Sequence, residues 1–208
     1  MVVSVGVDSD GDLKLVDVVQ TGVLAIAKAL EVNGVLTSLD VGDNNLTEEA
    51  ALGIVRVERQ RNKLTSLGLA GCRIGPTGAA EIAEYVSGSG VLKTLRLGGN
   101  KIGDEGAVAI ADALRVNGVL TDLNLCSNSI RAEGAAAIAE ALRGNAVLTD
   151  LNLFNNNIGP EGGIAIGKAL AVNEVLTKLN LRYNSLGDEG EKAIRDVVSE
   201  REGFELEM

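Results

Sequence analysis

Seven side chains, most of them in the C-terminal half of the sequence, have the chemistry of a protein-binding surface and recur at one spacing. Asp122, Asp150 and Lys178 lie 28 residues apart, and the same interval separates Phe154 from Arg182. Aromatic and arginine side chains are enriched among the residues that dominate binding energies at protein interfaces. The candidate partner-binding residues are Arg96, Asp122, Asp150, Phe154, Lys178, Arg182 and Tyr183.

The equal spacing brings equivalent residues of successive segments side by side. Asp122 and Asp150 are then neighbours of like charge, which is unfavourable, and Lys178 beside Asp150 with Arg96 diagonal to Asp122 would relieve the repulsion. The set forms either a partner-binding patch or a self-contained surface network of charges with two solvated rings. An asparagine row on the same strands reads more simply as a default of the repeat: Asn124, Asn152 and Asn180.

Residues for catalysis are missing from the sequence. There is no histidine to act as a base, no serine lies in a nucleophile elbow, and Gly98-Gly99 lacks the lysine and hydroxyl of a phosphate-binding loop. Cys126 has no obvious cation nearby to stabilise a thiolate. We therefore expect a protein that is not an enzyme and uses no cofactor.

One acidic run, from Asp8 to Asp12, resembles the start of a calcium loop. An EF-hand loop requires glycine at its sixth position and glutamate at its twelfth, but Leu13 and Val19 stand there. A different cation site would have to combine acids from two segments, and a simple acid-rich turn is the alternative that we favour. The acids in question are Asp10, Asp12, Asp40 and Asp43.

The overall charge of −10 and the pI of about 4.6 argue against nucleic acid, because affinity for phosphate backbones comes largely from lysine and arginine. A protein partner with a basic surface fits better. Two isolated cysteines are not a disulfide framework, and no apolar run approaches the 18 residues of a membrane span. We expect a soluble, cytoplasmic monomer with no membrane contact.

The elements that position the candidate residues are repeats. Residues 120–130 read Leu-Thr-Asp-Leu-Asn-Leu-Cys-Ser-Asn-Ser-Ile, and the same frame recurs from Leu36, Leu64, Leu92, Leu148 and Leu176. Six copies in strict 28-residue register predict a solenoid, in which each unit buries its apolar face against its neighbours.

Each unit predicts a short strand, a turn and a helix. Leu95 and Leu97 alternate with polar residues, Asn100 in the turn pairs with free backbone groups, and Asn117 ends the helix in a left-handed conformation. Strands stack about 4.8 Å apart whereas helix axes need about 8–10 Å, so the stack curves with the strands inside. The turn asparagines form a ladder with Cys72 on one rung: Asn44, Asn100, Asn128, Asn156 and Asn184.

The ends of the chain depart from this regularity. Residues 1–35 read as a degenerate N-terminal cap, in which Val2–Val7 adds an edge strand, and residues 204–208 as a C-terminal end that starts a last strand at Phe204. The copy at 36–63 carries four cations in its helical half, which we interpret as side chains on a solvated convex face rather than as a docking patch: Arg56, Arg59, Arg61 and Lys63.

The recurring Leu-Thr-x-Leu-x-Leu-x-x-Asn-x-Ile-Gly-x-Glu-Gly-Ala resembles the ribonuclease-inhibitor-like subclass of leucine-rich repeats, which NOD-like receptors and Ran GTPase-activating proteins also carry. The resemblance covers roughly residues 12–208 and implies a horseshoe that binds proteins on its concave sheet. This chain departs from those families in its shorter length, its lack of tryptophan and the absence of a long acidic tail.

We therefore predict a right-handed α/β solenoid with a parallel sheet on the concave face and helices on the convex face. Residues 1–208 form one domain: a cap at 1–35, six 28-residue repeats at 36–203 and an end at 204–208. The predicted function is non-catalytic binding of a protein on the concave sheet. Regulation of a small GTPase, through an edge residue, is the alternative.

Overall fold

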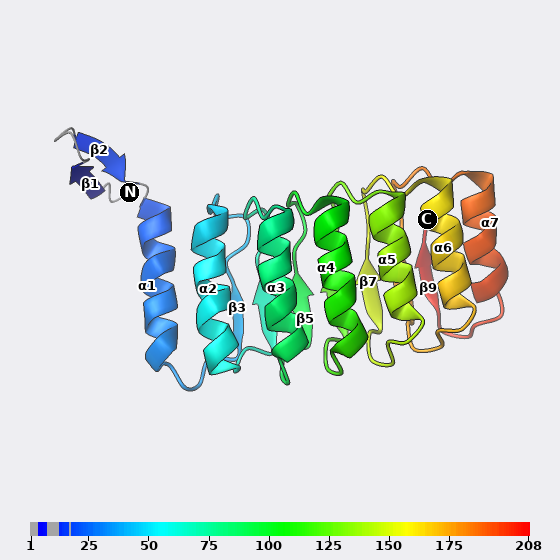
Figure 1. Ribbon diagram of the computed structural model, residues 1–208, viewed down its shortest axis with the longest axis horizontal. Coiled ribbons are helices and arrows are strands. Elements are labelled where there is room, and N and C mark those ends of the chain that lie inside the picture. Colours follow the sequence, from blue (N-terminus) through cyan, green and yellow to red (C-terminus); the bar gives the residue numbers. More distant parts are fainter. Residues whose placement is uncertain (1–3, 8–12, 17) are drawn as a thin grey trace.

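The computed structural model describes residues 4–7, 13–16 and 18–208. Its main feature, within those residues, is a seven-stranded parallel sheet in which the strand order follows the sequence, so each strand pairs with the one from the next repeat (Figure 1). Each strand has three residues. The strands are β3 (Ser38–Asp40), β4 (Ser66–Gly68), β5 (Thr94–Arg96), β6 (Asp122–Asn124), β7 (Asp150–Asn152), β8 (Lys178–Asn180) and β9 (Glu205–Glu207).

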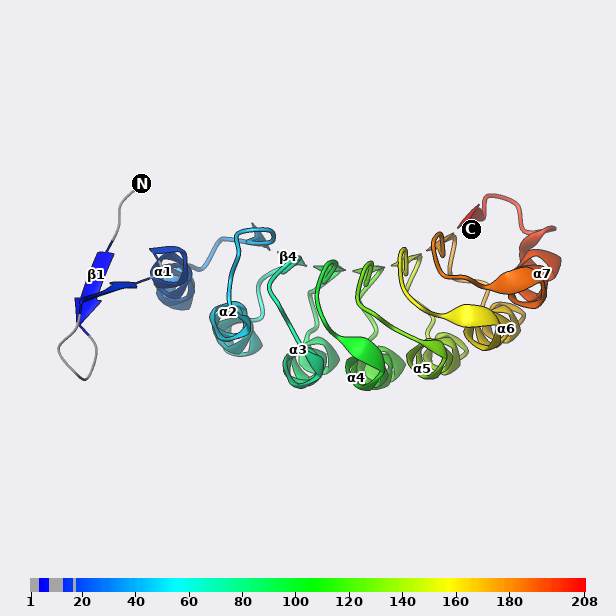
Figure 2. The ribbon, with the colours of Figure 1, turned by 90° about the horizontal axis from the view of Figure 1, so that it is seen from above.

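A helix connects each strand to the next, and all the helices lie on one side of the sheet. Figure 2 shows the stack curving gently, with the strands on the inner side of the arc and the helices on the outer side. The predicted α/β solenoid is confirmed. The helices are α1 (Val18–Val32), α2 (Glu48–Arg61), α3 (Pro76–Gly88), α4 (Gly103–Val116), α5 (Ala132–Leu142), α6 (Gly159–Leu170) and α7 (Gly187–Val198).

The core is a continuous layer between strands and helices. The inward leucines, such as Leu95 and Leu97, are fully buried, and so are the helix residues that face them, such as Ile110 and Leu114. Alanines on the buried stripe keep the helices close to the sheet, as at Ala107. Because every repeat contributes the same set, the core extends along the whole stack.

The predicted asparagine ladder is present in the turns. Asn156 shows it most completely: its Nδ2 donates to the carbonyls of Leu125 (3.0 Å) and Leu153 (3.0 Å), and its Oδ1 accepts from the backbone N–H of Ile130 (3.0 Å) and Asn128 (3.0 Å). One buried amide therefore satisfies backbone groups of two repeats, which would otherwise be costly to bury. On the Cys72 rung only a weak thiol contact to the Ala70 carbonyl replaces it, at 3.4 Å.

A second ladder lies at the helix C-termini, where the predicted left-handed geometry is wrong. Asn117 has φ −78°. Its Oδ1 accepts from the backbone N–H of Val119 (2.9 Å) and Leu120 (2.8 Å), and its Nδ2 donates to the carbonyl of Val86 in the preceding repeat (2.7 Å). The asparagine is used for its side-chain hydrogen bonds across the repeat boundary, and Asn145 and Asn173 repeat the pattern.

Helix N-termini are also stabilised across repeats. Asp104 lies in the first turn of α4. Its Oδ1 accepts from the backbone N–H of Arg131 (2.7 Å) and Gly134 (2.9 Å) at the start of the following helix. The carboxylate thus satisfies N–H groups that α5 itself leaves free, and it ties two repeats together.

The ends differ from each other. Residues Glu205–Glu207 form β9, which extends the main sheet in parallel with β8 and confirms the predicted last strand. At the other end, β1 (Ser4–Val7) pairs antiparallel with β2 (Leu13–Val16) in a separate two-stranded sheet. The expectation that this segment adds an edge strand to the solenoid sheet is therefore wrong.

Across the described part of the chain, every helix is too short or too polar to cross a lipid bilayer.

Candidate functional site

Strand register brings the predicted acidic and basic residues together on the concave face. Asp122 of β6 pairs with Asp150 of β7, and Asp150 pairs with Lys178 of β8. Parallel pairing in register puts equivalent side chains on the same face of the sheet. The expected neighbourhood of Asp122, Asp150 and Lys178 is therefore present.

The asparagine row between the acids and the aromatics has a structural role. The Oδ1 atoms of Asn124, Asn152 and Asn180 accept from backbone N–H groups two residues further on, at 2.9, 2.9 and 3.1 Å. These bonds fix the backbone at the positions of Cys126, Phe154 and Arg182. The same bond recurs in three successive repeats, which agrees with the interpretation of the row as a default of the repeat.

Two aromatic rings form the most distinctive feature of this face. Phe154 and Tyr183 meet edge to face, with centroids 5.1 Å apart and ring planes at 79°, a favoured geometry for aromatic pairs. The Arg182 guanidinium lies 5.6 Å from the Tyr183 ring centroid. Phe154 is half-buried, whereas Tyr183 is 67% exposed. A large amphipathic surface is thus presented to solvent.

Most of the cations on the C-terminal strands already have acidic partners. Lys178 Nζ lies 3.9 Å from Asp150 and 3.5 Å from Glu205, and Arg182 lies 4.0 Å from Glu207. Burial, and next the negative charge of Asp122, raise the pKa of Asp150, while Lys178 acts in the opposite direction. The like-charge repulsion inferred from the sequence is thus present and only partly relieved.

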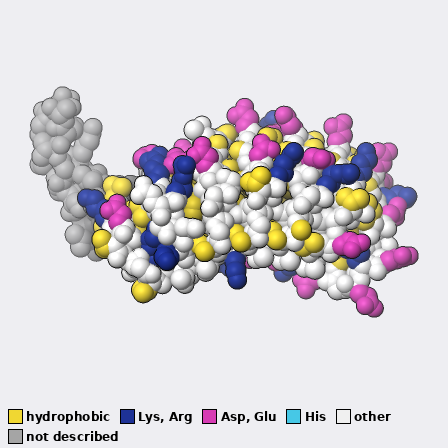
Figure 3. All heavy atoms as spheres, turned by 60° about the horizontal axis from the view of Figure 1, so that its bottom comes forward, with side chains coloured by type: hydrophobic (Ala, Val, Ile, Leu, Met, Phe, Trp, Pro, Cys, Tyr) yellow, Lys and Arg dark blue, Asp and Glu magenta, His cyan; other side chains and the backbone are white. Residues whose placement is uncertain are grey.

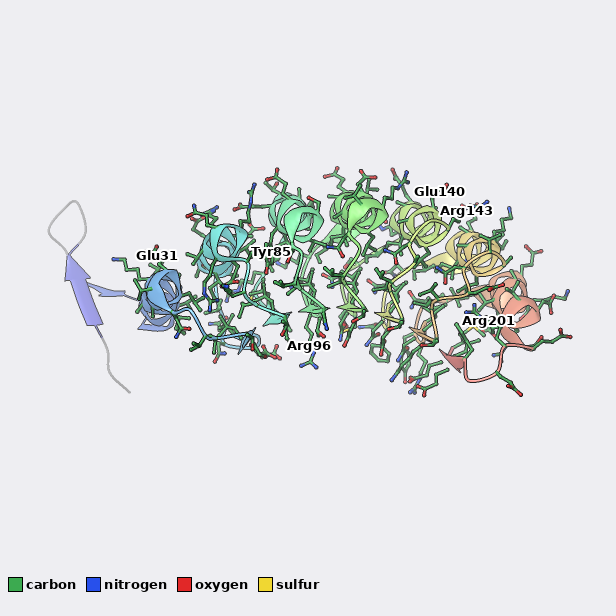
Figure 4. All side chains as sticks on the ribbon, turned by 90° about the horizontal axis from the view of Figure 1, so that it is seen from below. Glu31, Tyr85, Arg96, Glu140, Arg143 and Arg201 are labelled. Carbon is green, nitrogen blue, oxygen red and sulfur yellow. The ribbon has the colours of Figure 1, made fainter. Side chains whose placement is uncertain are left out.

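Arg96 does not take the predicted place. Its guanidinium lies 3.8 Å from the Asp40 carboxylate, two strands towards the N-terminus rather than diagonal to Asp122. Gly68 lies between them and leaves the space, since a Cβ there would stand 2.3 Å from Asp40 Cγ. Figure 4 shows Arg96 projecting from the strand side, away from the helices. The prediction that Arg96 relieves Asp122 is wrong.

Cys126 lies beside the aromatic pair in the same row as Phe154. Its Sγ fills the space over Gly98, where a Cβ would stand only 2.6 Å away. Burial raises the pKa of the Cys126 thiol, so the group is protonated at neutral pH. A protonated thiol is a poor nucleophile, in line with the expectation from the sequence.

The hypothetical cation site at the N-terminal end is only partly within the described residues. Asp8, Asp10 and Asp12 lie outside them, and in the described residues no three acids, cysteines or histidines come together as a metal site. Asp40, which is described, accepts a backbone hydrogen bond from Gly42 at 2.9 Å and pairs with Arg96.

One cluster escaped the sequence analysis. Arg61, expected on a solvated face, is almost fully buried and forms an ion pair with the fully buried Glu58. Arg61 donates to the carbonyls of Asn33 (2.6 Å) and Leu36 (2.6 Å), and Glu58 accepts from the Leu64 N–H (3.1 Å). The pair performs the task that a single asparagine performs at the ends of α4, α5 and α6.

Tyr85 completes this cluster on the neighbouring helix. Its ring is buried at a position where other repeats have alanine or valine, and its hydroxyl finds no hydrogen-bond partner among the described residues. Burial, followed by the charge of Glu58, raises the pKa of Tyr85 to about 12; Figure 4 shows the side chain beside α2 and α3. The repeat frame held the signal, because Glu58 stands where other repeats have Leu or Val.

The protein is a curved α/β solenoid whose open sheet carries aromatic and charged side chains on its concave face. The leucine-rich repeat model matches the chain in six segments that together cover more than half of it: residues 32–55, 61–83, 91–111, 116–139, 144–167 and 172–194. The chain therefore belongs to the leucine-rich repeat family. No curated protein sequence matches it.

Several solved structures resemble this one, including the two that follow. The first is "Leiomodin-1 Actin-Binding Site 2", with a TM-score of 0.59 and 24% identity over 88% of this chain and 90% of that one. The second is the tropomodulin C-terminal domain of Caenorhabditis elegans, with a TM-score of 0.51 and 12% identity over 85% of this chain and 91% of that one. At such identities the likeness concerns the fold alone.

Proposed function

We propose that this chain is a non-catalytic protein-interaction module that binds a protein partner on the concave face of its C-terminal repeats. The observation that carries the proposal is the edge-to-face pair of Phe154 and Tyr183, flanked by Arg182, on the strand side of the sheet. Asp122, Asp150 and Lys178 orient the partner, and Arg96 contributes from β5, on the same face towards the N-terminus.

The backbone at Tyr183 supports this assignment. Tyr183 has φ +58°, a conformation in which a bulky side chain is an outlier. The turn has a positive φ in every repeat, but the equivalent residues are Asp43, Gly71, Gly99, Ser127 and Asn155, which are smaller and tolerate it more easily. Strained residues concentrate at functional sites, and contact of the exposed ring with a partner accounts for a tyrosine here.

Actin is the first partner to test, because the similar leiomodin-1 domain is named an actin-binding site. Co-sedimentation with actin filaments, and gel filtration with monomeric actin, would measure it. The alternative, regulation of a small GTPase, has less support, since neither structural relative carries such a description. A phosphate-release assay with a GTP-loaded small GTPase would test it directly.

Affinity capture from native lysate tests the patch itself. The double variant Phe154→Ala/Tyr183→Ala should lose the captured partners while its thermal unfolding stays nearly unchanged, because both rings are at the surface. The matched control is Val116→Ala/Val172→Ala, which removes two exposed hydrophobic side chains outside the sheet face and should capture normally. Equal capture by both variants and the wild type would refute the assignment.

We further propose finer features of the same protein. Ribonuclease-inhibitor-like repeats, similar to those of NOD-like receptors, are supported by the 28-residue period and by helices of 11 to 14 residues in repeats 36–203. The charge of −10 supports a partner with a basic surface and disfavours nucleic acid. We propose one domain over 1–208, capped at 1–35, acting as a cytoplasmic monomer; light scattering at several concentrations would test the monomer.

A further inference from the structure

The concave patch also indicates the chemistry of the partner, on the assumption that the proposed function is right. We propose that the partner presents an extended segment with a lysine or arginine that enters between Asp122 and Asp150. An apolar side chain four residues away in that segment packs on Phe154 and Tyr183. The patch then has two subsites: an acidic one, Asp122 with Asp150, and an aromatic one, Phe154 with Tyr183. The charge balance of the concave face and the spacing of these subsites lead to the proposal.

Charge complementarity selects a cationic segment. The concave positions are the two outward-facing residues of each strand of the main sheet and the residue two positions after the strand. These positions hold three cations, Arg96, Lys178 and Arg182, and five acids. Each of these cations already lies within 4.0 Å of an acid, whereas Asp122 has no ion pair within residues 18–208. The acids of this set are Asp40, Asp122, Asp150, Glu205 and Glu207. Figure 3, which shows another side of the molecule, also has acidic side chains gathered towards the C-terminal end.

The separation of the two subsites fits an extended peptide. Asp150 and Phe154 are four residues apart in and just after β7, so their Cα atoms are about 13 Å apart at a strand rise of about 3.3 Å per residue. A partner in the same extended conformation covers that distance in four residues. Asn152 between them is uncharged, and its Oδ1 accepts a hydrogen bond from the backbone N–H of Phe154 at 2.9 Å, so it adds no competing charge between the two subsites.

A cation should bind the pair of Asp122 and Asp150 more tightly than it would bind one isolated carboxylate. Asp122 and Asp150 are in-register neighbours on adjacent strands, about 4.8 Å apart, and like charges placed so are destabilising. A lysine or arginine side chain between them reaches both carboxylates and removes the repulsion on binding. Its release restores the repulsion, so charge contributes to the affinity as well as to orientation.

Selection from a library of random 12-residue peptides displayed on phage tests the proposal. Against the wild type we expect enrichment of peptides with Lys or Arg four positions from a large apolar residue. Against Asp122→Asn/Asp150→Asn the basic residue should lose its enrichment while the apolar one keeps it. The charge-matched control, Asp112→Asn/Glu140→Gln on exposed helix positions, should select the same peptides as the wild type.

The selections separate two kinds of failure. If wild-type peptides bind through Phe154 and Tyr183 but carry no basic residue at a fixed spacing, this inference is overturned and the proposed function survives. If peptides selected on the wild type bind Phe154→Ala/Tyr183→Ala equally well, the proposed function fails as well.

A binding titration with one selected peptide gives the quantitative test. Replacing its basic residue by methionine should weaken binding to the wild type at least tenfold, which corresponds to about 1.4 kcal/mol. The same replacement should weaken binding to Asp122→Asn/Asp150→Asn less than threefold, because uncharged amides have replaced the two carboxylates. Equal losses on both proteins would show that the cation binds elsewhere.

Discussion

The two ends of the solenoid carry their unusual residues on opposite sides of the sheet. In the repeats at 36–91 the exceptions are buried, at Glu58, Arg61 and Tyr85, while the concave face there has no aromatic residue and carries mostly small ones, such as Gly68 and Ala70. In the repeats from 120 onwards the interior is more regular, with one asparagine at the ends of α5 and α6 and Arg201 at the end of α7. Their exceptions, such as Phe154 and Tyr183, lie on the surface.

The buried exceptions of the N-terminal repeats should therefore affect stability, and the exposed ones of the C-terminal repeats should affect binding. A buried charge must be matched by partners inside the fold, so exceptions in the N-terminal repeats affect how firmly neighbouring repeats hold together. An exposed aromatic ring costs the fold little and is free to contact another molecule. Substitutions at the N-terminal end should therefore change unfolding but not binding, and substitutions on the C-terminal concave face should do the reverse.

The largest effect is expected at Arg61. Arg61→Ala leaves Glu58 as an uncompensated buried charge and should lower the free energy of unfolding by about 3–5 kcal/mol. The loss would be measured as a lower urea midpoint. Because each repeat contacts only its neighbours, amide hydrogen exchange should become faster first in α1 and α2. Arg59→Ala, which breaks an exposed pair with Glu84 at 2.9 Å, is the control and should cost about 1 kcal/mol or less. Equal losses in the two variants would contradict a structural role for Arg61.

The corresponding position in the regular region should respond less. Asn145→Ala removes a 2.7 Å bond to the Leu114 carbonyl and leaves the N–H groups of Val147 and Leu148 without their acceptor. Buried unsatisfied groups cost about 1–3 kcal/mol, so we expect a loss of about 2–3 kcal/mol in urea unfolding. A loss larger than that of Arg61→Ala would reverse the comparison.

Removing the hydroxyl of Tyr85 should stabilise the protein. The hydroxyl has no hydrogen-bond partner among the described residues and lies near a buried carboxylate. Tyr85→Phe keeps the ring and should raise the free energy of unfolding by about 1 kcal/mol, measured as a higher urea midpoint. Peptide binding at the concave face should not change. A destabilised variant would mean that the hydroxyl is satisfied in solution.

The smallest effect concerns Asp122 and the pH dependence of stability. Since the pKa of Asp150 is raised in the folded protein, the fold binds more protons than the unfolded chain between the ordinary pKa of aspartate and the raised one. Stability therefore falls as pH rises through that window, and the cost is fully present at neutral pH. Asp122→Asn should raise the free energy of unfolding at pH 7 by about 0.2–1 kcal/mol.

Melting curves recorded from pH 3 to pH 7 would measure this effect. The gain from Asp122→Asn should shrink towards pH 3, where Asp150 becomes protonated. A gain that does not depend on pH would exclude charge repulsion as its cause. The same variant should weaken binding of basic peptides, so the concave acids favour recognition at a small cost in stability.

Much of this architecture could be predicted from the sequence because the pattern repeats locally. Leucines two residues apart define a strand with one buried face, and a fixed 28-residue register brings Asp122, Asp150 and Lys178 together without any long-range information. The turn asparagines followed for the same reason, since each bonds to backbone within its own repeat and the one before. The geometry of the aromatic pair, by contrast, depends on the turn conformation at Tyr183.

Only the tertiary structure decided the contacts of side chains that differ from one repeat to the next. The guanidinium of Arg96 lies against Asp40 across the space that Gly68 leaves. Arg61 turns to the carbonyls of Asn33 and Leu36, as Arg201 does to those of Asn173 and Leu176, and Glu58 on the core stripe pairs with Arg61. The asparagines at the helix ends serve the neighbouring repeat rather than a left-handed turn. Periodicity determines which positions face inward, but the direction of a long charged side chain depends on the space and partners that its neighbours leave.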